Sequence, residues 1–424
     1  MVTFELPWDA PYTVDTTYKN YLTNGNGHYI FILNKTAWAY FACSDPIGYL
    51  KKAQKEGINT IRVALEGLPY YDVLQIDLWP WGGTRKNPDY SKLNESYWNE
   101  VENRVRLAGE MGIGIDLCLY LTMSFDKSMI NTQIHYWKNI IQRLGKYSNI
   151  LTWEIQNEYV KNEEFQKAAA KYFKKNDPYK RPVCTSDITT DNAVWTNRDW
   201  IDLAIVHTCT GSTPSDIKTI DQLNDQKGAT HHLKNWYQAV ARNVRSHNKP
   251  AFNNESGREK RHMNDDPVHR RKQAWIFNCS GCFWTHHSWD GCEGINDMNY
   301  SAPGSNFLPS VRTFFETIPF WTFNPDYTAV QNDSELLLST MGDLNRSCVI
   351  TYICTLLTGQ HINSEQLTLR LPSGSYLIDF ISPVSLETIK QYNIKSKSLD
   401  HINEVIIPDF SDDILVKISL SKKQ

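Results

Sequence analysis

The strongest constraint on the fold is a repeated alternation of short apolar runs with amphipathic stretches along most of the chain. Most of the runs are continuously apolar, as expected of parallel strands that are buried on both faces. Repeated strand–helix units in this order predict a (β/α)8 TIM barrel, an α/β fold, that ends near Thr317. The expected strands are residues 36–41, 59–65, 113–119, 150–155, 182–187, 203–207, 250–254 and 279–284.

The stretches between these runs carry a helical pattern. In residues 97–111, Trp98, Val101, Val105 and Ala108 recur at three- and four-residue spacing and therefore share one face of a helix. Glu100, Glu102, Arg104 and Arg106 lie at other positions, as on a helix with one apolar face. Similar segments are expected at residues 51–55, 132–144, 163–174, 231–246 and 268–277.

The pattern changes after Pro319. From there to the C-terminus only short β runs occur, separated by turns such as Pro372-Ser373-Gly374, which predicts a small β-sandwich of about 100 residues. At the other end, the turn at residues 24–27 and the run that follows it predict an N-terminal β-hairpin. We therefore expect a barrel domain at residues 1–318, including the hairpin, and an all-β sandwich at residues 319–424.

The charge balance excludes several classes of partner. Lys and Arg number 44 against 47 Asp and Glu, a net charge of −3, so no global field attracts nucleic acid or an anionic membrane. No run approaches the roughly 20 apolar residues of a membrane span, and the first residues lack the pattern of a signal peptide. The chain is therefore expected to be cytoplasmic, or secreted with its signal removed, and the oligomeric state stays open.

Aromatic residues and cysteines give two further indications. The 14 Trp, 22 Tyr and 16 Phe exceed what a core of this size needs, and they suit a surface that stacks on flat ligands. The 9 Cys are scattered, so buried free thiols are expected. Cys279 and Cys282 form one C-x-x-C without a second pair, which argues against zinc. We expect neither a metal nor a cofactor.

Two glutamates fall where a barrel of this kind places its chemistry, at the carboxyl ends of the strands. Glu158 ends the fourth run, directly after Asn157, whose amide can donate a hydrogen bond to a bound hydroxyl. Glu255 ends the seventh run. Glycoside hydrolysis needs such a pair, because one carboxyl protonates the leaving oxygen and the other attacks the anomeric carbon or activates water. The alternative is two solvated glutamates in surface loops.

These residues carry a resemblance to a known group. Trp153, Asn157 and Glu158 resemble the strand-four acid/base motif of the retaining glycoside hydrolases of clan A, the cellulase-like (β/α)8 barrels. Glu255 matches the strand-seven nucleophile of that clan. The resemblance implies that Glu255 is the nucleophile and Glu158 the general acid/base of a double displacement.

Other stretches narrow the resemblance to one branch. Residues 27–38 and 90–121 resemble the apiosidase-like branch of the clan, and residues 318–327 resemble its usual junction to a C-terminal sandwich. That sandwich bears a collagen-binding label, although nothing in this sequence supports collagen as a partner. The branch implies an apiose- or arabinose-type side chain as substrate, whereas the wider clan implies a β-glucan or a mannan.

Two further residues are expected to support the pair. Arg62 lies near the end of strand two, where the clan carries an arginine that keeps the nucleophile ionised, and the alternative is a structural ion pair. His207 ends strand six, where relatives carry a histidine followed by an aromatic residue. Here Thr208 follows, so the usual tyrosine partner of the nucleophile is not visible. His207 is either a substrate contact or a satisfied core histidine.

Aromatic platforms for the sugar are expected on two strands. Trp38 lies at the end of strand one and Trp284 on strand eight, where an indole can stack on the apolar face of a sugar. Core packing is the alternative for each. His286 is assigned to substrate binding; its neighbour His287 points in another direction along the strand, which argues against a metal site. The long aromatic loop at residues 66–83 is expected to wall one side of the cleft.

The sequence thus predicts a retaining O-glycosidase that acts on a poly- or oligosaccharide. One alternative is a degenerate barrel that binds carbohydrate without cleaving it, but such a barrel would be expected to have lost one of the two carboxylates. Another is a transglycosylase that uses the same carboxylates with an acceptor hydroxyl in place of water. Nothing in the sequence separates hydrolysis from transglycosylation, or exo from endo action.

Overall fold

The computed structural model describes residues 8–66, 79–158, 161–188, 192–208, 233–257, 266–287 and 305–421. Its contacts group the chain into two units. The first consists of Met1–Cys209, Ser246–Arg258 and Trp284–Ala302, and the second of Thr210–Arg245, Glu259–Phe283 and Pro303–Gln424. The domain boundary after residue 318 stays a prediction.

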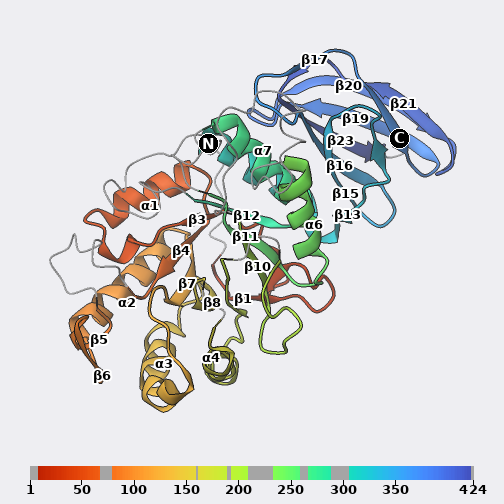
Figure 1. The fold of residues 1–424 in the computed structure, drawn as a ribbon. Helices are drawn as coiled ribbons and strands as arrows, with labels where there is room; N and C mark the ends of the chain where they lie inside the picture. The colour runs from red at the N-terminus through yellow and green to blue at the C-terminus, as the bar shows by residue number, and fades with distance from the viewer. Residues whose placement is uncertain are drawn as a thin grey trace. The chain divides into compact units, whose positions relative to one another are not determined.

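The first unit is built on an eight-stranded parallel sheet (Figure 1). Its strand order, β10-β11-β12-β3-β4-β7-β8-β9, follows the chain in one direction around a near-closed barrel, as the sequence predicts. The fold is therefore a TIM-like barrel. The strands are β3 (Asn34–Thr36), β4 (Thr60–Ala64), β7 (Gly114–Tyr120), β8 (Ile150–Gln156), β9 (Val183–Cys184), β10 (Ala204–His207), β11 (Ala251–Glu255) and β12 (Phe283–His286).

The helices of this unit follow the predicted amphipathic segments. In α2, Trp98, Val101, Val105 and Ala108 are all buried, as their spacing predicts. The Asn94 side chain caps this helix by accepting a hydrogen bond from the Tyr97 N–H at 3.3 Å. The helices are α1 (Pro46–Lys55), α2 (Glu95–Glu110), α3 (Ile130–Leu144) and α4 (Glu163–Asn176).

The first barrel strand differs from its prediction. It is β3 at Asn34–Thr36, and residues 40–42 form a 3-10 helix, whereas the apolar run predicted a strand at 36–41. The strand includes two polar residues whose partners are distant in sequence. Lys35 Nζ pairs with Glu56 at 2.8 Å, and Asn34 donates to Asp116 at 3.3 Å. Buried polar residues of this kind are invisible to a hydrophobicity pattern.

Connections outside the barrel were predicted less well. The N-terminal hairpin pairs β1 (Tyr12–Val14) with β2 (Leu22–Asn24), and the predicted partner run contributes one isolated bridge, between Thr23 and Tyr29. A second hairpin, β5 (Trp81–Thr84) with β6 (Asn87–Leu93), follows strand β4 and was not predicted. Residues 67–78 of the aromatic loop lie outside the described residues.

A polar layer crosses the interior of the barrel sheet below the strand ends. Asp116 of β7 accepts hydrogen bonds from Asn34 at 3.3 Å, from Asn254 of β11 at 3.4 Å and from the hydroxyl of Thr152 on β8. Burial, assisted by the charge of Glu154, raises the pKa of Asp116 to about 6, although the charge of Arg62 lowers it. These bonds fix the strands relative to one another beneath the two glutamates.

The second unit contains α6 (Ala239–Arg245), α7 (Pro267–Asn278), α9 (Leu308–Glu316) and the C-terminal β-sheets. A six-stranded antiparallel sheet has the order β13-β15-β16-β23-β19-β20, and a three-stranded sheet the order β14-β18-β21. Their strands are β13 (Asn324–Pro325), β14 (Val330–Gln331), β15 (Leu337–Gly342), β16 (Cys348–Cys354), β18 (Gln366–Arg370), β19 (Gly374–Ile381), β20 (Thr388–Ser396), β21 (Ile402–Ile406) and β23 (Asp413–Leu420).

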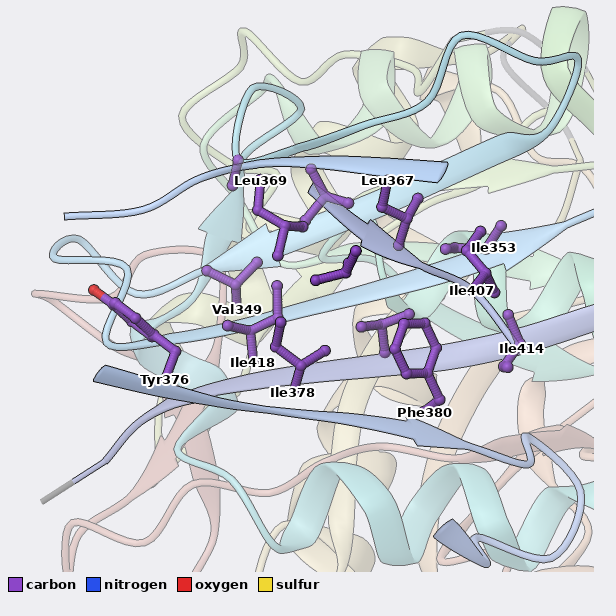
Figure 2. Packing of buried hydrophobic residues seen from close by; sticks show 14 of the residues in the cluster. Val349, Ile353, Leu367, Leu369, Tyr376, Ile378, Phe380, Ile407, Ile414 and Ile418 are labelled. Carbon is purple, nitrogen blue, oxygen red and sulfur yellow. The ribbon is translucent and has the colours of Figure 1, made fainter. Parts of the chain in front are cut away.

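The two sheets enclose an apolar core, which makes this region the predicted β-sandwich. Figure 2 shows Leu367 and Leu369 of β18 facing Val349, Ile378 and Ile418 of the larger sheet, and all of them are buried. The burial pattern of β18 alternates, as expected for a strand with one face in a core.

Two expectations about the whole chain can be compared with the described residues. Seven cysteines there are free thiols, and all except Cys348 are buried, while Cys209 and Cys292 lie outside the described residues. Among the described helices none combines the length and apolar character that crossing a bilayer requires.

Candidate active site

The two predicted glutamates lie together at the carboxyl ends of their strands. Glu158 follows the end of β8 by two residues, and Glu255 is the last residue of β11. Ligand-type atoms of Glu158, His207 and Glu255 all lie within 4.8 Å of one another. The Glu158 side chain is 26 % exposed and that of Glu255 only 3 %, so one carboxyl faces solvent and the other is enclosed.

Glu158 is held in an unusual backbone conformation. Its φ is +53°, in the left-handed region that side chains other than glycine rarely adopt. Its N–H donates to the hydroxyl of Ser186 at 3.2 Å, and its Oε1 lies 3.0 Å from Nδ1 of His207. The turn thus directs the carboxyl of Glu158 away from the line of β8 and toward β10, which carries His207.

Glu255 is kept ionised by its neighbours. Arg62 Nη1 donates to Glu255 Oε1 at 2.8 Å, and His207 Nδ1 lies 3.8 Å from Oε2. Burial by itself raises the pKa of Glu255, but electrostatic interactions with His207, His287 and Arg62, together with the hydrogen bond from Arg62, outweigh it and lower this pKa below its usual value. A carboxylate that stays charged inside the barrel has the property a nucleophile needs.

Arg62 binds more than the predicted partner. Besides Glu255, its Nε and Nη2 donate to the carboxylate of Glu154 at 2.7 and 2.6 Å, and Nη2 donates to Oδ1 of Asn157 at 2.8 Å. The guanidinium is fully buried, and its carbon lies 4.4 Å from the ring centroid of Trp38. Three of the predicted site residues, Glu255, Asn157 and Trp38, therefore meet around the Arg62 cation.

Two residues that were predicted to contact the substrate, Trp284 and His286, lie on β12. Trp284 and His286 are fully buried, and their ring centroids lie 5.7 Å apart. Core packing accounts for this position of Trp284. The roles of Trp284, His286 and Trp38 as substrate contacts stay predictions.

Comparison with known proteins decides the family. Residues 16–300 match the model of the apiosidase-like catalytic domain. The chain belongs to the apiosidase-like family. It is thus a glycoside hydrolase, and the match spans both glutamates and all the barrel strands. A comparison with curated proteins gives no significant match.

Solved structures support the fold of this apiosidase-like chain. A glycoside hydrolase of family 5 from Bacteroides vulgatus has a TM-score of 0.74 at 16% identity, covering 100% of this chain and 96% of its own. A second structure, described as a glycoside hydrolase, has a TM-score of 0.73 at 15% identity and covers 100% of both chains. A family 30 xylanase from Clostridium acetobutylicum has a TM-score of 0.52 at 11% identity, covering 97% of this chain and 100% of its own.

Three residues of the apiosidase-like site were not predicted from the sequence. Glu154 and Ser186 are fully buried and bind Arg62 and Glu158, respectively. His287 is also buried, and its Nδ1 lies 2.9 Å from the hydroxyl of Thr36. One signal was available for Glu154: a charged residue in the middle of an otherwise apolar strand requires a buried partner of opposite charge.

Glu158, His207 and Glu255 together offer the donor types of a metal site. Two carboxylates and one imidazole within 4.8 Å suit a divalent cation. In this structure, however, Nδ1 of His207 is bonded to Glu158, and Arg62 already supplies the positive charge that faces Glu255. We therefore interpret the cluster as a hydrogen-bonded acid–base set. The absence of a cofactor stays a prediction.

The Arg62 network leads to a test by substitution. In Arg62→Met, Glu255 loses its charge-assisted hydrogen bond, so its pKa rises and the acidic limb of the pH–rate profile moves to higher pH. Because the folded-state pKa of Glu255 is depressed, its ionised form stabilises the fold above the unfolded pKa. This stabilisation disappears as pH falls through the folded pKa. We expect the variant to lose about 3–5 kcal/mol of unfolding free energy at neutral pH.

Arg181→Met is the matched control. Arg181 is equally buried and pairs with Asp177 at 2.8 Å, without a contact to either glutamate among the described residues. We expect it to lower the urea midpoint similarly while leaving the acidic limb in place. An acidic limb that stays unchanged in Arg62→Met would make Arg62 a structural ion pair only.

Proposed function

We propose that this apiosidase-like chain is a retaining O-glycosidase with Glu255 as nucleophile and Glu158 as general acid/base. The observation that carries the proposal is the close approach of the two carboxyl groups, whose ligand atoms lie within 4.8 Å. Retaining enzymes hold their carboxyl groups roughly 5–5.5 Å apart, and inverting enzymes roughly 6.5–9.5 Å apart to admit a water. The spacing here supports direct attack on the sugar.

In the first step, Glu158 donates its proton to the glycosidic oxygen as the bond from that oxygen to the anomeric carbon breaks. An oxygen of Glu255 forms a new bond to that carbon, and the aglycone leaves as a neutral alcohol. In the second step, the ionised Glu158 removes a proton from water, whose oxygen attacks the anomeric carbon. The bond to Glu255 breaks, and both carboxyl groups return to their starting states.

The surroundings of the two glutamates support this division of roles. Glu255 is enclosed and bonded to a buried guanidinium, which favours the ionised form that a nucleophile requires. Glu158 is partly exposed and can exchange protons with solvent in the second step. His207 lies between them and orients Glu158 through its Nδ1.

The stereochemistry of the product tests the mechanism. We expect the first-formed product to have the same anomeric configuration as the substrate, because two inversions at one carbon restore it. The measurement is a proton NMR time course on a substrate found by screening plant and microbial glycans. Glycosides of apiose come first in the panel, because the family model bears that name. A first-formed product of inverted configuration would overturn the retaining assignment.

A further inference from the structure

The left-handed conformation of Glu158 requires a constraint. A φ of +53° is sterically unfavourable for a residue with a side chain, because Cβ then approaches the following carbonyl oxygen. Strained residues persist where the surrounding structure over-determines them, and they concentrate at functional sites. One constraint on the backbone of Glu158 is the hydrogen bond that its N–H donates to the hydroxyl of Ser186 at 3.2 Å.

The hydroxyl of Ser186 is itself oriented by a carboxylate. Its oxygen lies 2.9 Å from Oε1 of Glu154, and Ser186 is fully buried. Among the described residues, the only other acceptor for this hydroxyl is Oδ1 of Asn157, at 3.3 Å, and both oxygens can only accept. The hydroxyl proton therefore points toward these two oxygens, of which that of Glu154 is the nearer. A lone pair of the hydroxyl oxygen then remains for the N–H of Glu158. Because Ser186 donates its proton toward Glu154, its oxygen accepts the hydrogen bond from the N–H of Glu158.

Glu154 is fixed in turn by the guanidinium that also holds the nucleophile. Arg62 binds the carboxylate of Glu154 through two nitrogens, at 2.7 and 2.6 Å, and binds Glu255 through the third, at 2.8 Å. A planar guanidinium with two parallel bonds to one carboxylate has a fixed orientation. A chain of hydrogen bonds therefore runs from Glu255 through Arg62, Glu154 and Ser186 to the backbone of Glu158, and Asn157 Oδ1, which lies 2.8 Å from Arg62 Nη2 and 3.3 Å from Ser186 Oγ, joins it from the side.

We propose that Glu154 and Ser186 are positioning residues, which set the backbone of Glu158 relative to the nucleophile. The inference rests on the proposed roles of Glu158 and Glu255. All the linking side chains are fully buried, so water does not compete for their bonds. Catalytic groups must be held to about 0.5 Å, and a misplacement of 1 Å can cost roughly 10²-fold in rate. Loss of the link is therefore expected to lower kcat rather than raise KM.

Two adjacent hydroxyls provide a matched experiment. Ser186→Ala removes the link, whereas Thr185→Ala removes a buried hydroxyl whose bonds run to Gln166 at 2.6 Å and to the Gln156 carbonyl at 3.0 Å. We expect the two variants to lose similar unfolding free energy in urea. Only Ser186→Ala is expected to lose kcat, by about tenfold, with KM within twofold. Equal kcat in Ser186→Ala and Thr185→Ala would overturn the proposal.

A second pair of variants tests Glu154. Glu154→Gln keeps the size of the side chain but presents an N–H to the guanidinium, so we expect kcat to fall by about 10²-fold. Glu56→Gln is the control, since Glu56 is a buried partner of Lys35 at 2.8 Å in the same unit. If Glu154→Gln fails to fold, the Ser186 comparison still decides the proposal. A folded Glu154→Gln with the kcat of Glu56→Gln would contradict it.

A double-mutant cycle separates this inference from the proposed function. If Ser186 acts through Glu158, then Ser186→Ala costs nothing further in a Glu158→Ala background, measured on a substrate with an activated leaving group. Additive losses would show that Ser186 acts elsewhere, and they would overturn the proposal. Failure of the proposed function is visible separately, because Glu158→Ala by itself would then keep wild-type activity on unactivated substrates.

Discussion

Glu255→Ala is expected to abolish turnover, with kcat lower by roughly 10⁵-fold or more, as when the nucleophile of other covalent enzymes is removed. The variant has no oxygen positioned to attack the anomeric carbon, while Glu158 can still protonate the leaving group. Added azide is small enough to occupy the vacated space and attack the same carbon. We expect azide to restore turnover on an activated substrate and to give a glycosyl azide of inverted configuration, measured by NMR.

The fold of Glu255→Ala is expected to persist, because Arg62 keeps its two bonds to Glu154. Glu56→Ala is the control for removal of a buried, paired carboxylate outside the site. Wild-type activity in Glu255→Ala, or a folded variant that azide does not rescue, would count against a nucleophilic role.

Glu158→Ala is expected to have an effect that depends on the leaving group. General acid–base catalysis contributes about 10²–10⁴-fold, so substrates with poor leaving groups should lose a factor of that size. Substrates with activated leaving groups need no protonation, and they should still form the glycosyl ester on Glu255. Because no base then activates water, this ester accumulates, and a burst of aglycone should precede a slow steady state.

The azide product also distinguishes the role of Glu158 from that of Glu255, because the two alanine variants should give different anomeric configurations. Azide needs no general base, so it should accelerate the second step of Glu158→Ala and give a glycosyl azide of retained configuration. Equal losses in the rate of the first step, measured as the burst or as kcat/KM, for activated and unactivated leaving groups would contradict the acid/base assignment, as would an azide product of inverted configuration.

The barrel could be predicted from the sequence because its strands are continuous apolar runs at regular intervals. Residues 150–155 and 250–254 fell within one or two residues of β8 and β11, which placed both glutamates at strand ends. The first strand was misplaced because Asn34 and Lys35 are polar and find their partners, Asp116 and Glu56, far along the chain. The β5–β6 hairpin was missed because its burial pattern gives no regular alternation.

The predicted site was incomplete for the same physical reason. Arg62 was expected to pair with Glu255, and it does, but the strand pattern did not identify Glu154 and Asn157 as its further partners. Ser186 has no distinctive neighbours in sequence, and its proposed role comes from a hydroxyl placed between Glu154 of β8 and the backbone of Glu158 just after that strand. Such roles depend on three-dimensional proximity, which a strand pattern specifies only to within a residue or two.

The backbone of Glu158 has a consequence for how such barrels diverge. A glycine would adopt its φ of +53° without strain, so the glutamate holds a conformation that its own side chain disfavours. In a descendant that binds sugars but no longer cleaves them, glycine or asparagine at this position would relieve that strain and lose only the side-chain contact to His207. In newly sequenced genomes, the residue that aligns with Glu158 should therefore distinguish active members of the lineage from those that have become binding proteins.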